Sequence, residues 1–262
     1  MAYVLALDFD GVISDSLLES YLITWRIAGR FDPLLAPDDG FLPTLENIHR
    51  FRERHLMHWN SFRALVPFCN RGEDYLLAHR AVREKRHITT QEEFSSFARS
   101  QPRDQLDRFH QEFYVERYRL ADENRQAWLA LNAAYPGVAD ALEALAGRFT
   151  LAVATSKDRE SVRLLLQDYG MEGLFEPRAV LDKSAGASKR AHLDALHEIY
   201  RCPFDRMTFI DDKVAHLLNC APLGIRPCLA GWGYNGPAEH ELARSHDIPV
   251  LKIADLPALA PA

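Results

Sequence analysis

Residues 3–12, with the sequence YVLALDFDGV, constrain the fold more than any other part of the chain. The first five are apolar or small, and the run ends abruptly at Asp8, Asp10 and Gly11. A short apolar run bounded by a turn signal predicts a strand buried on both faces of a parallel sheet. Residues two apart in an extended backbone point to the same side, so the carboxylates of Asp8 and Asp10 would lie together.

Two carboxylates on one side of a strand end are unfavourable unless a cation or a proton joins them, which is a first indication of chemistry. Gly11 would let the chain turn tightly and bring backbone N–H groups close to a bound group. A solvated turn after an edge strand would give the same short pattern. The rest of the chain therefore has to decide between a site and a turn.

Composition excludes several classes of protein. A chain of 262 residues can bury a sizeable core in one or two domains. The net charge of −6, with no block of like charge, lacks the basic footprint expected of a nucleic-acid-binding protein. The four cysteines form neither a CxxC pair nor a disulfide framework, which is typical of reduced thiols in the cytosol.

No signal peptide and no membrane span are expected. The apolar run at the start has no basic region before it, and no apolar stretch approaches the roughly 20 residues that a membrane helix needs. We therefore predict a soluble, cytoplasmic protein whose partner is neither a membrane nor a nucleic acid.

From Ser14 to Tyr135 the sequence shows no convincing strand. The segment Ser14-Asp15-Ser16 can cap a helix, and the apolar residues after it have helical spacing. Further helical patterns cover roughly 43–66, 73–86, 90–99 and 103–131. We therefore predict that residues 14–135 form an all-helical domain inserted after the first strand, and this cap domain is large enough to suggest a possible homodimer contact.

From Pro136 onward helical and strand patterns alternate. Helices are predicted over 138–147, 158–169, 189–201 and up to about 221, and strands over 149–154, 179–181, 207–210, 225–230 and 249–253. Strands that alternate with helices of this length form a parallel sheet with right-handed crossovers. The predicted fold is thus α/β, with residues 1–13 and 136–262 forming a Rossmann-like core.

Polar side chains follow three of the predicted strands. They are Asp8 with Asp10, Thr155 with Ser156, and Asp211 with Asp212. The carboxyl ends of parallel strands lie along one edge of the sheet, so these groups should meet in one crevice, together with a lysine from the loop before helix 189–201. Several carboxylates in one cleft need a divalent ion, and oxygen ligands without His or Cys favour Mg²⁺ over zinc.

Taken in order, Asp8-Phe9-Asp10-Gly11-Val12, Thr155, Lys189 and Asp211-Asp212 resemble the four motifs of the haloacid dehalogenase superfamily of phosphohydrolases. The helical insertion after the first motif also resembles that family. Pro136-Gly137-Val138 and the segment 231–235 (GWGYN) are similar to phosphoglycolate-phosphatase-like members. The motifs span the core domain, about half of the chain. The resemblance implies Mg²⁺-dependent hydrolysis of a phosphate monoester of a small metabolite.

The resemblance also implies a role for each motif residue. Asp8 would attack phosphorus and form an aspartyl-phosphate, and Asp10 would act as general acid and then general base. Magnesium would be bound by Asp8, Asp211 and the backbone carbonyl of Asp10, with Asp212 as a further ligand. The remaining predicted groups would contact the substrate phosphate: Gly11, Thr155, Ser156 and Lys189.

Several alternatives stay open at this stage. Lys183 competes with Lys189, because the proline that often follows the family's lysine is Arg190 here. Asp212 is either an outer ligand or a helix N-cap. The family's further acid a few residues on is absent, since Ala215 and His216 stand there.

Two further questions stay open: the role of two histidines in the insertion, and the choice between hydrolysis and rival functions. His55 and His58 share a helix face, for which a packed or solvated face is favoured over a metal pair. A phosphomutase or another phosphotransferase acting on a sugar phosphate would use the same core chemistry. A non-catalytic binding module would be expected to lack Asp8 or Asp10. The sequence does not name the substrate.

Overall fold

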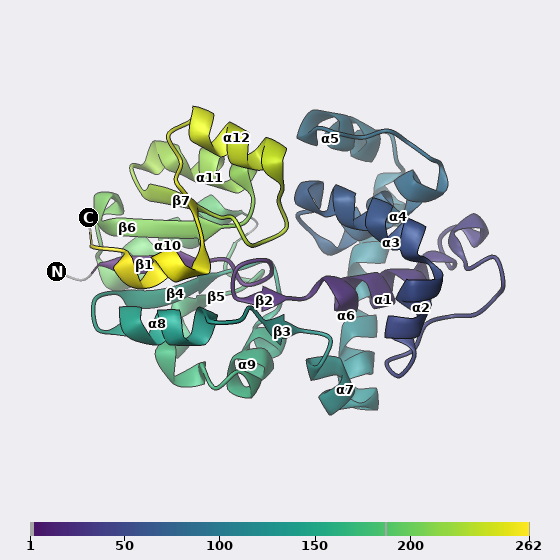
Figure 1. The fold of residues 1–262 in the computed structure, drawn as a ribbon, viewed down its shortest axis with the longest axis horizontal. Coiled ribbons are helices and arrows are strands. Elements are labelled where there is room, and N and C mark those ends of the chain that lie inside the picture. Colours follow the sequence, from purple (N-terminus) through teal and green to yellow (C-terminus); the bar gives the residue numbers. More distant parts are fainter. Residues whose placement is uncertain (1–2, 187, 262) are drawn as a thin grey trace. The chain divides into compact units, whose positions relative to one another are not determined.

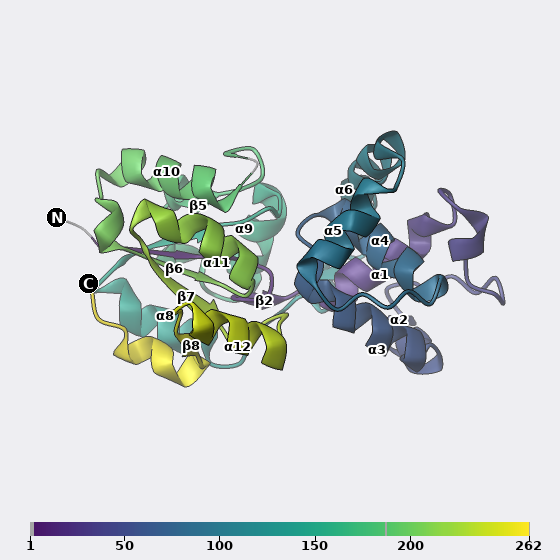
Figure 2. The same cartoon turned by 90° about the horizontal axis from the view of Figure 1, so that it is seen from above.

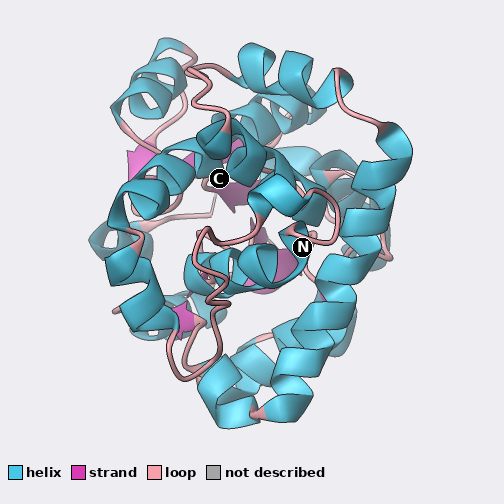
Figure 3. Ribbon diagram, turned by 90° about the vertical axis from the view of Figure 1, so that its right-hand side faces the viewer, coloured by secondary structure: helices cyan, strands magenta, loops and turns pink. Residues whose placement is uncertain are grey.

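The computed structural model of the protein describes residues 3–186 and 188–261. The chain divides into two compact units, one comprising residues up to Asp15 and from Ala133 on, the other Ser16–Asn132 (Figure 1). The first unit is an α/β domain. The second, which is described throughout, contains only helices and loops (Figure 3). Each unit is considered by itself.

The first unit contains a parallel sheet. Within the described residues its six strands are β1 (Val4–Leu7), β4 (Thr150–Ala154), β5 (Val180–Leu181), β6 (Met207–Asp211), β7 (Arg226–Ala230) and β8 (Val250–Leu251). Their order in the sheet is β5-β4-β1-β6-β7-β8, and every neighbouring pair is parallel. In chain order this is 3-2-1-4-5-6, the order of a doubly wound Rossmann sheet. The predicted fold class is confirmed.

Helices cover both faces of this sheet. They are α8 (Val138–Ala146), α9 (Arg159–Asp168), α10 (Lys189–Tyr200), α11 (Val214–Cys220) and α12 (Pro237–Ser245). Figure 2 shows α10 on one side of the strands and α8 on the other. Strand β1 is fully buried between them, as its apolar run predicts. Sequence reasoning missed α12, because Ala243 is the one residue of that helix that is fully buried, which leaves little apolar periodicity.

Two short strands correct the expectation that residues 14–135 contain none. Strand β2 (Ser14–Asp15) pairs antiparallel with β3 (Ala133–Ala134). Two-residue strands are too short to show an alternating pattern in the sequence. Ser14 and Asp15 therefore belong to a strand, and Ser16 occupies the N-cap position of α1 (Leu17–Ala28).

The second unit is built from helices. They are α1, α2 (Ile48–Arg54), α3 (Leu56–Leu65), α4 (Gly72–Arg83), α5 (Gln91–Arg99), α6 (Arg103–Glu123) and α7 (Arg125–Leu129). Two predicted long helices are each split. His55 separates α2 from α3, and Asn124 separates α6 from α7. Asn124 is extended and its side-chain oxygen accepts the N–H of Ala127 at 3.0 Å, so it caps a new helix. Among the described residues no helix is long and apolar enough to cross a bilayer.

A chain of hydrogen bonds runs through the interior of the second unit. The Tyr21 hydroxyl lies 3.0 Å from His58 Nδ1, and His58 Nε2 lies 2.8 Å from His79 Nδ1. His79 Nε2 lies 2.8 Å from the carbonyl oxygen of Leu35. A carbonyl oxygen only accepts, so His79 Nε2 donates. Burial lowers the pKa of His79 and favours the neutral ring, in which Nδ1 accepts from His58. Tyr21 then donates to His58, and both imidazoles are neutral. His58 belongs to a packed aromatic interior, the reading favoured over a metal pair.

This arrangement predicts that the helical unit loses stability in mild acid. Burial lowers the pKa of His58 to about 2 and that of His79 to about 4. Both bind protons near pH 6.5 when unfolded, so their contribution is complete above about pH 6.5 and falls as the pH drops from there toward about 4. We expect a decline of up to about 1.4 kcal/mol per pH unit for each histidine. Urea unfolding followed by tryptophan fluorescence measures it, since Trp25, Trp59 and Trp128 lie in this unit.

The matched control is His87→Gln, which removes an exposed histidine of the same unit and should leave the pH profile unchanged. In the variant His79→Gln the free energy of unfolding should depend less steeply on pH, even though this variant is less stable than the wild type at neutral pH. A profile that stays as steep in His79→Gln as in the wild type would contradict this assignment.

Candidate active site

The two strands at the switch point of the sheet carry the predicted acids. Strands β1 and β6 are neighbours in the 3-2-1-4-5-6 order, and sheets of this kind bind their ligands outside the carboxyl ends of the strands at this switch point. Asp8 directly follows β1, and its N–H donates to the carbonyl of Ile210 at 2.9 Å. Asp211 ends β6, and Asp212 follows. The topology therefore brings together acids that are about 200 residues apart, as predicted.

Lys189 connects these acids. It is the first residue of α10, whose N-cap residue Ser188 accepts the N–H of Ala191. Lys189 Nζ lies 2.6 Å from Asp8 Oδ1 and 3.4 Å from Asp211 Oδ2, and it donates to the carbonyl of Ala154 at 2.7 Å. The ammonium group is thus buried among three oxygens.

The structure also places the competing lysine and the second predicted acid. Lys183 is exposed, whereas Lys189 contacts Asp8. Asp10 Oδ1 lies 3.2 Å from Nζ of Lys157, a buried lysine to which sequence reasoning gave no role. Its signal was its position, directly after Thr155 and Ser156 at the end of β4. Each of the two acids of the first motif therefore has its own lysine.

Burial sets the electrostatics of the acids. It raises the pKa of Asp8, against the opposing charge of Lys189, and it raises the pKa of Asp212 well above its usual value. Burial also acts on Asp211, but His216 and Lys189 outweigh it and hold the pKa of Asp211 below its usual range. The raised pKa values of Asp8 and Asp212 indicate that the cluster accommodates additional positive charge.

The donor groups fit a divalent cation. One ligand atom each from Asp8, Asp211 and His216 lie within 4.8 Å of one another. Oδ1 of Asp212 is buried and has no hydrogen-bond partner, which is costly unless a cation binds there. The sequence argument for magnesium counted no histidine, whereas the structure places His216 beside these acids: its Nδ1 lies 3.0 and 3.1 Å from the Asp211 oxygens.

The segment after β7 holds Asp212 in place. The N–H of Tyr234 donates to Asp212 Oδ2 at 2.9 Å, and the side-chain amide of Asn235 donates to the Asp212 carbonyl at 2.9 Å. The Trp232 indole N–H donates to the carbonyl of Val12 at 3.0 Å. The segment 231–235, noticed in the sequence only through its resemblance, therefore joins Asp212 to the loop that carries Gly11.

Gly11 is required both by its backbone conformation and by its neighbours. Its φ is +83°, and a Cβ at this position would overlap the Asp212 carboxylate. Gly11→Ala should therefore displace Asp212, weaken cation binding and lower the melting temperature. Gly224→Ala is a matched control, because Gly224 has φ +87° and nothing near its missing Cβ. Backbone strain of about 1–2 kcal/mol is common to both variants. A difference between them, measured by thermal unfolding and calorimetric cation binding, isolates the contact with Asp212.

If Gly11→Ala and Gly224→Ala behave alike in both measurements, the close approach of Gly11 to Asp212 has no role in the site.

Thr155 and Ser156 lie at the end of β4, next to β1 in the sheet. Thr155 is buried, and its hydroxyl accepts the N–H of Lys157 at 3.1 Å. Ser156 is half-buried. Their position agrees with a role at the strand ends, and their contact with a phosphoryl group stays a prediction.

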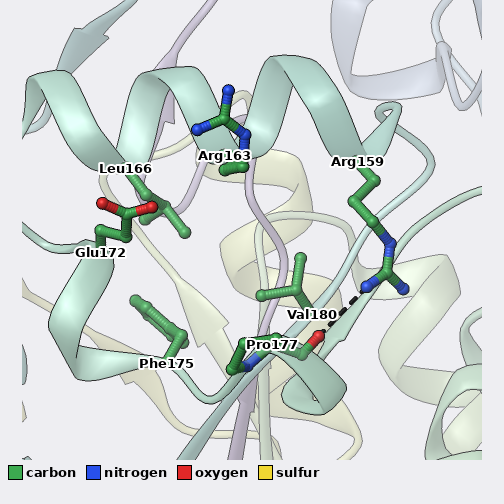
Figure 4. Close-up of a pocket in the computed structure, with 7 residues that line it drawn as sticks. All are labelled: Arg159, Arg163, Leu166, Glu172, Phe175, Pro177 and Val180. Atoms are coloured by element: carbon green, nitrogen blue, oxygen red, sulfur yellow. Dashed lines mark hydrogen bonds between the residues drawn. The ribbon is translucent and has the colours of Figure 1, made fainter.

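A separate cavity of about 140 Å³ lies beside α9 (Figure 4). Leu166, Phe175 and Val180 line it, and Arg159 donates to the carbonyl of Pro177 at 3.1 Å. None of the predicted site residues belongs to its lining. Its volume is well below the roughly 300–1,000 Å³ of a typical ligand pocket, so we assign it no ligand.

The sequence matches a known family. Residues 71–226, more than half of the chain, match the haloacid dehalogenase-like hydrolases, and the chain belongs to this family. The match begins after the first motif, so Asp8 and Asp10 lie outside it. In the structure Asp8 lies close to Lys189 and Asp211, and the roles of Asp8 and Asp10 in the family pattern stay predictions.

Solved structures share the fold. A haloacid dehalogenase-like hydrolase from Streptococcus pneumoniae is 16% identical with a TM-score of 0.62, covering 98% of this chain and 97% of that one. A protein named as a predicted phosphoglycolate phosphatase from Haemophilus somnus is 20% identical with a TM-score of 0.58, covering 97% and 96%. At these identities the likeness establishes the fold.

A curated relative carries a different activity in its name. The tyrosine-protein kinase PtkA of Mycobacterium tuberculosis is 32% identical over 117 residues, which are 44% of this chain and 40% of the relative. The chain therefore spans less than half the length of the curated relatives that it matches.

Proposed function

We propose that the protein hydrolyses a phosphate monoester of a small metabolite through an aspartyl-phosphate on Asp8, with a divalent cation. The contact of Lys189 Nζ with Asp8 Oδ1, at 2.6 Å, supports this proposal most directly. It pairs a carboxylate at a strand end with a buried cation that can offset the charge of an incoming phosphate.

In the first step an oxygen of Asp8 would form a bond to phosphorus while the bond from phosphorus to the ester oxygen breaks. Asp10 would give its proton to the leaving oxygen. In the second step Asp10 would take a proton from water, and that water oxygen would replace Asp8 on phosphorus. Splitting the hydrolysis in this way makes each step easier than direct attack by water.

The cation would be held by Asp8, Asp211 and Asp212 with the backbone carbonyl of Asp10, and when bound it supplies charge neutralisation between the acids and the phosphate. Lys189 keeps Asp8 in position through its additional bond to the Ala154 carbonyl. Lys157 pairs with Asp10 before the substrate arrives. Thr155, Ser156 and the backbone at Gly11 would hold the phosphoryl oxygens.

A panel of phosphomonoesters tests the proposal. We expect phosphate release that depends on added cation and stops when a chelator removes it. Acid quenching during turnover should trap a phosphorylated peptide containing Asp8, which mass spectrometry identifies and hydroxylamine cleaves. Cation-dependent release without any phosphorylated Asp8 peptide would argue for direct attack by water.

Phosphotransfer is the second candidate, and the relatives named as tyrosine-protein kinases favour it. The same aspartyl-phosphate could pass its phosphoryl group to a hydroxyl rather than to water. A sugar phosphomutase would need a bisphosphate activator and release little phosphate. A protein kinase would transfer the phosphoryl group to a tyrosine hydroxyl of an added protein. Measuring phosphate release, sugar phosphate isomers and phosphotyrosine on the same samples separates the three.

A further inference from the structure

His216 occupies an unusual position beside the acids. It is the third residue of α11, and its side chain is 18% exposed. Its Nδ1 lies 3.0 Å from Asp211 Oδ2 and 3.1 Å from Asp211 Oδ1, so the nitrogen faces the carboxylate and not the solvent. Sequence reasoning noted only that this position lacks an acid.

The distances suit a shared ion. Nδ1 of His216 and one oxygen each of Asp8 and Asp211 lie within 4.8 Å of one another. Ligand atoms bound to one ion at about 2.1 Å are at most about 4.2 Å apart, so shifts well below 1 Å would bring the three atoms onto one ion. These three atoms form a mixed set of two oxygens and one nitrogen.

A second observation concerns Asp212, the residue that follows Asp211 in the sequence. Asp212 Oδ1 is buried without a hydrogen-bond partner, and the negative charges of Asp8 and Asp211 lie close enough to act on that carboxyl group. Hydrogen bonds from Tyr234 and Asn235 fix the residue, so its open oxygen cannot simply rotate into water.

We propose that His216 binds the divalent cation directly through Nδ1, and that the site therefore prefers a first-row transition ion such as Mn²⁺ or Co²⁺ to Mg²⁺. This inference rests on the cation site of the proposed function. Imidazole nitrogen is a good ligand for transition ions, whereas Mg²⁺ selects oxygen. With His216 among the ligands, the argument for Mg²⁺ from oxygen ligands alone no longer applies.

The proton on the imidazole has a defined place in both states. Without an ion, Nδ1–H donates to Asp211, which accounts for the two short contacts. With an ion, the lone pair of Nδ1 binds it and the hydrogen is carried by Nε2.

Calorimetric titration with Co²⁺ and with Mg²⁺ tests the preference. In His216→Asn we expect the Kd for Co²⁺ to rise by about tenfold or more, while the Kd for Mg²⁺ changes by less than about threefold. His246→Asn, which replaces an exposed histidine of the same unit, should change neither Kd. Equal weakening of both ions in His216→Asn would show that His216 only positions Asp211, and would overturn the proposal.

Pulsed electron paramagnetic resonance of bound Mn²⁺ tests the bond between His216 and the ion itself. Wild-type protein should show a ¹⁴N coupling that becomes a ¹⁵N coupling when histidine is labelled with ¹⁵N. The coupling should be absent in folded His216→Asn and present in His246→Asn. Bound Mn²⁺ without nitrogen coupling in the wild type refutes the proposal. Neither measurement uses turnover, so nitrogen-bound Mn²⁺ with no phosphate release would reject the proposed function and retain this inference.

Discussion

The variant Asp8→Asn is expected to abolish turnover, lowering kcat/KM by about 10⁴-fold or more on the best phosphomonoester. The amide has the size of the carboxylate but neither its charge nor its nucleophilic oxygen. Lys189 keeps two of its three oxygen partners, those from Ala154 and Asp211, so the protein should still fold. Phosphate release and acid-quench trapping measure the loss, and circular dichroism checks the fold.

Asp168→Asn is the matched control, since it makes the same change at an exposed position at the end of α9. Its turnover should equal that of the wild type. If Asp8→Asn retained a substantial fraction of the activity, the released phosphate would come from another site or from a contaminant, and the covalent mechanism would be abandoned.

The second large effect concerns stability. Arg117→Met should destabilise the helical unit by about 3–5 kcal/mol, because it leaves a buried carboxylate without its cation. Arg117 Nε and Nη2 donate to the two oxygens of Glu19 at 2.9 and 3.0 Å, and the indole of Trp128 donates to Glu19 at 2.7 Å. The side chain of Arg117 is 4% exposed and that of Glu19 is 0% exposed. Tryptophan fluorescence during urea unfolding measures the change.

Arg103→Met on the same helix provides the comparison. Arg103 pairs with Asp107 in solvent, with side chains 72% and 53% exposed, and such pairs contribute at most about 1 kcal/mol. The double variant Glu19→Gln with Arg117→Met should recover part of the loss by removing the unpaired charge. A loss in Arg117→Met no larger than that in Arg103→Met would show that the buried pair contributes nothing beyond a surface pair.

Much of the fold could be predicted from local patterns of apolar residues in the sequence. The apolar run of β1, the alternation after Pro136 and the helical spacing of the insertion each depend on side chains that repeat with the period of their element. The features that were wrong or missed lack such a period. Strands β2 and β3 are held by each other across about 120 residues, and α12 buries little. The break at Asn124 depends on a single side-chain cap.

The candidate site could be predicted from the sequence to about the same extent as the fold. Asp8 and Asp211 were placed correctly at neighbouring strand ends, because parallel topology fixes which ends meet. Lys157 and His216, which lie beside Asp10 and Asp211 in the structure, were not assigned roles. A lysine or histidine close to a motif is common in any sequence, and only the three-dimensional arrangement distinguishes one that faces an acid from one that faces water.

The pairing of β2 with β3 has a consequence for how such a chain can diversify. Register places Ser14 opposite Ala134 and Asp15 opposite Ala133, so the chain leaves the α/β unit and returns to it at adjacent points. A two-residue turn could close that gap as an ordinary hairpin. The insertion is therefore a module whose two connections to the α/β unit lie side by side at β2 and β3. Recombination at these connections could exchange it for another insertion without altering the order of strands that brings Asp8 to Asp211.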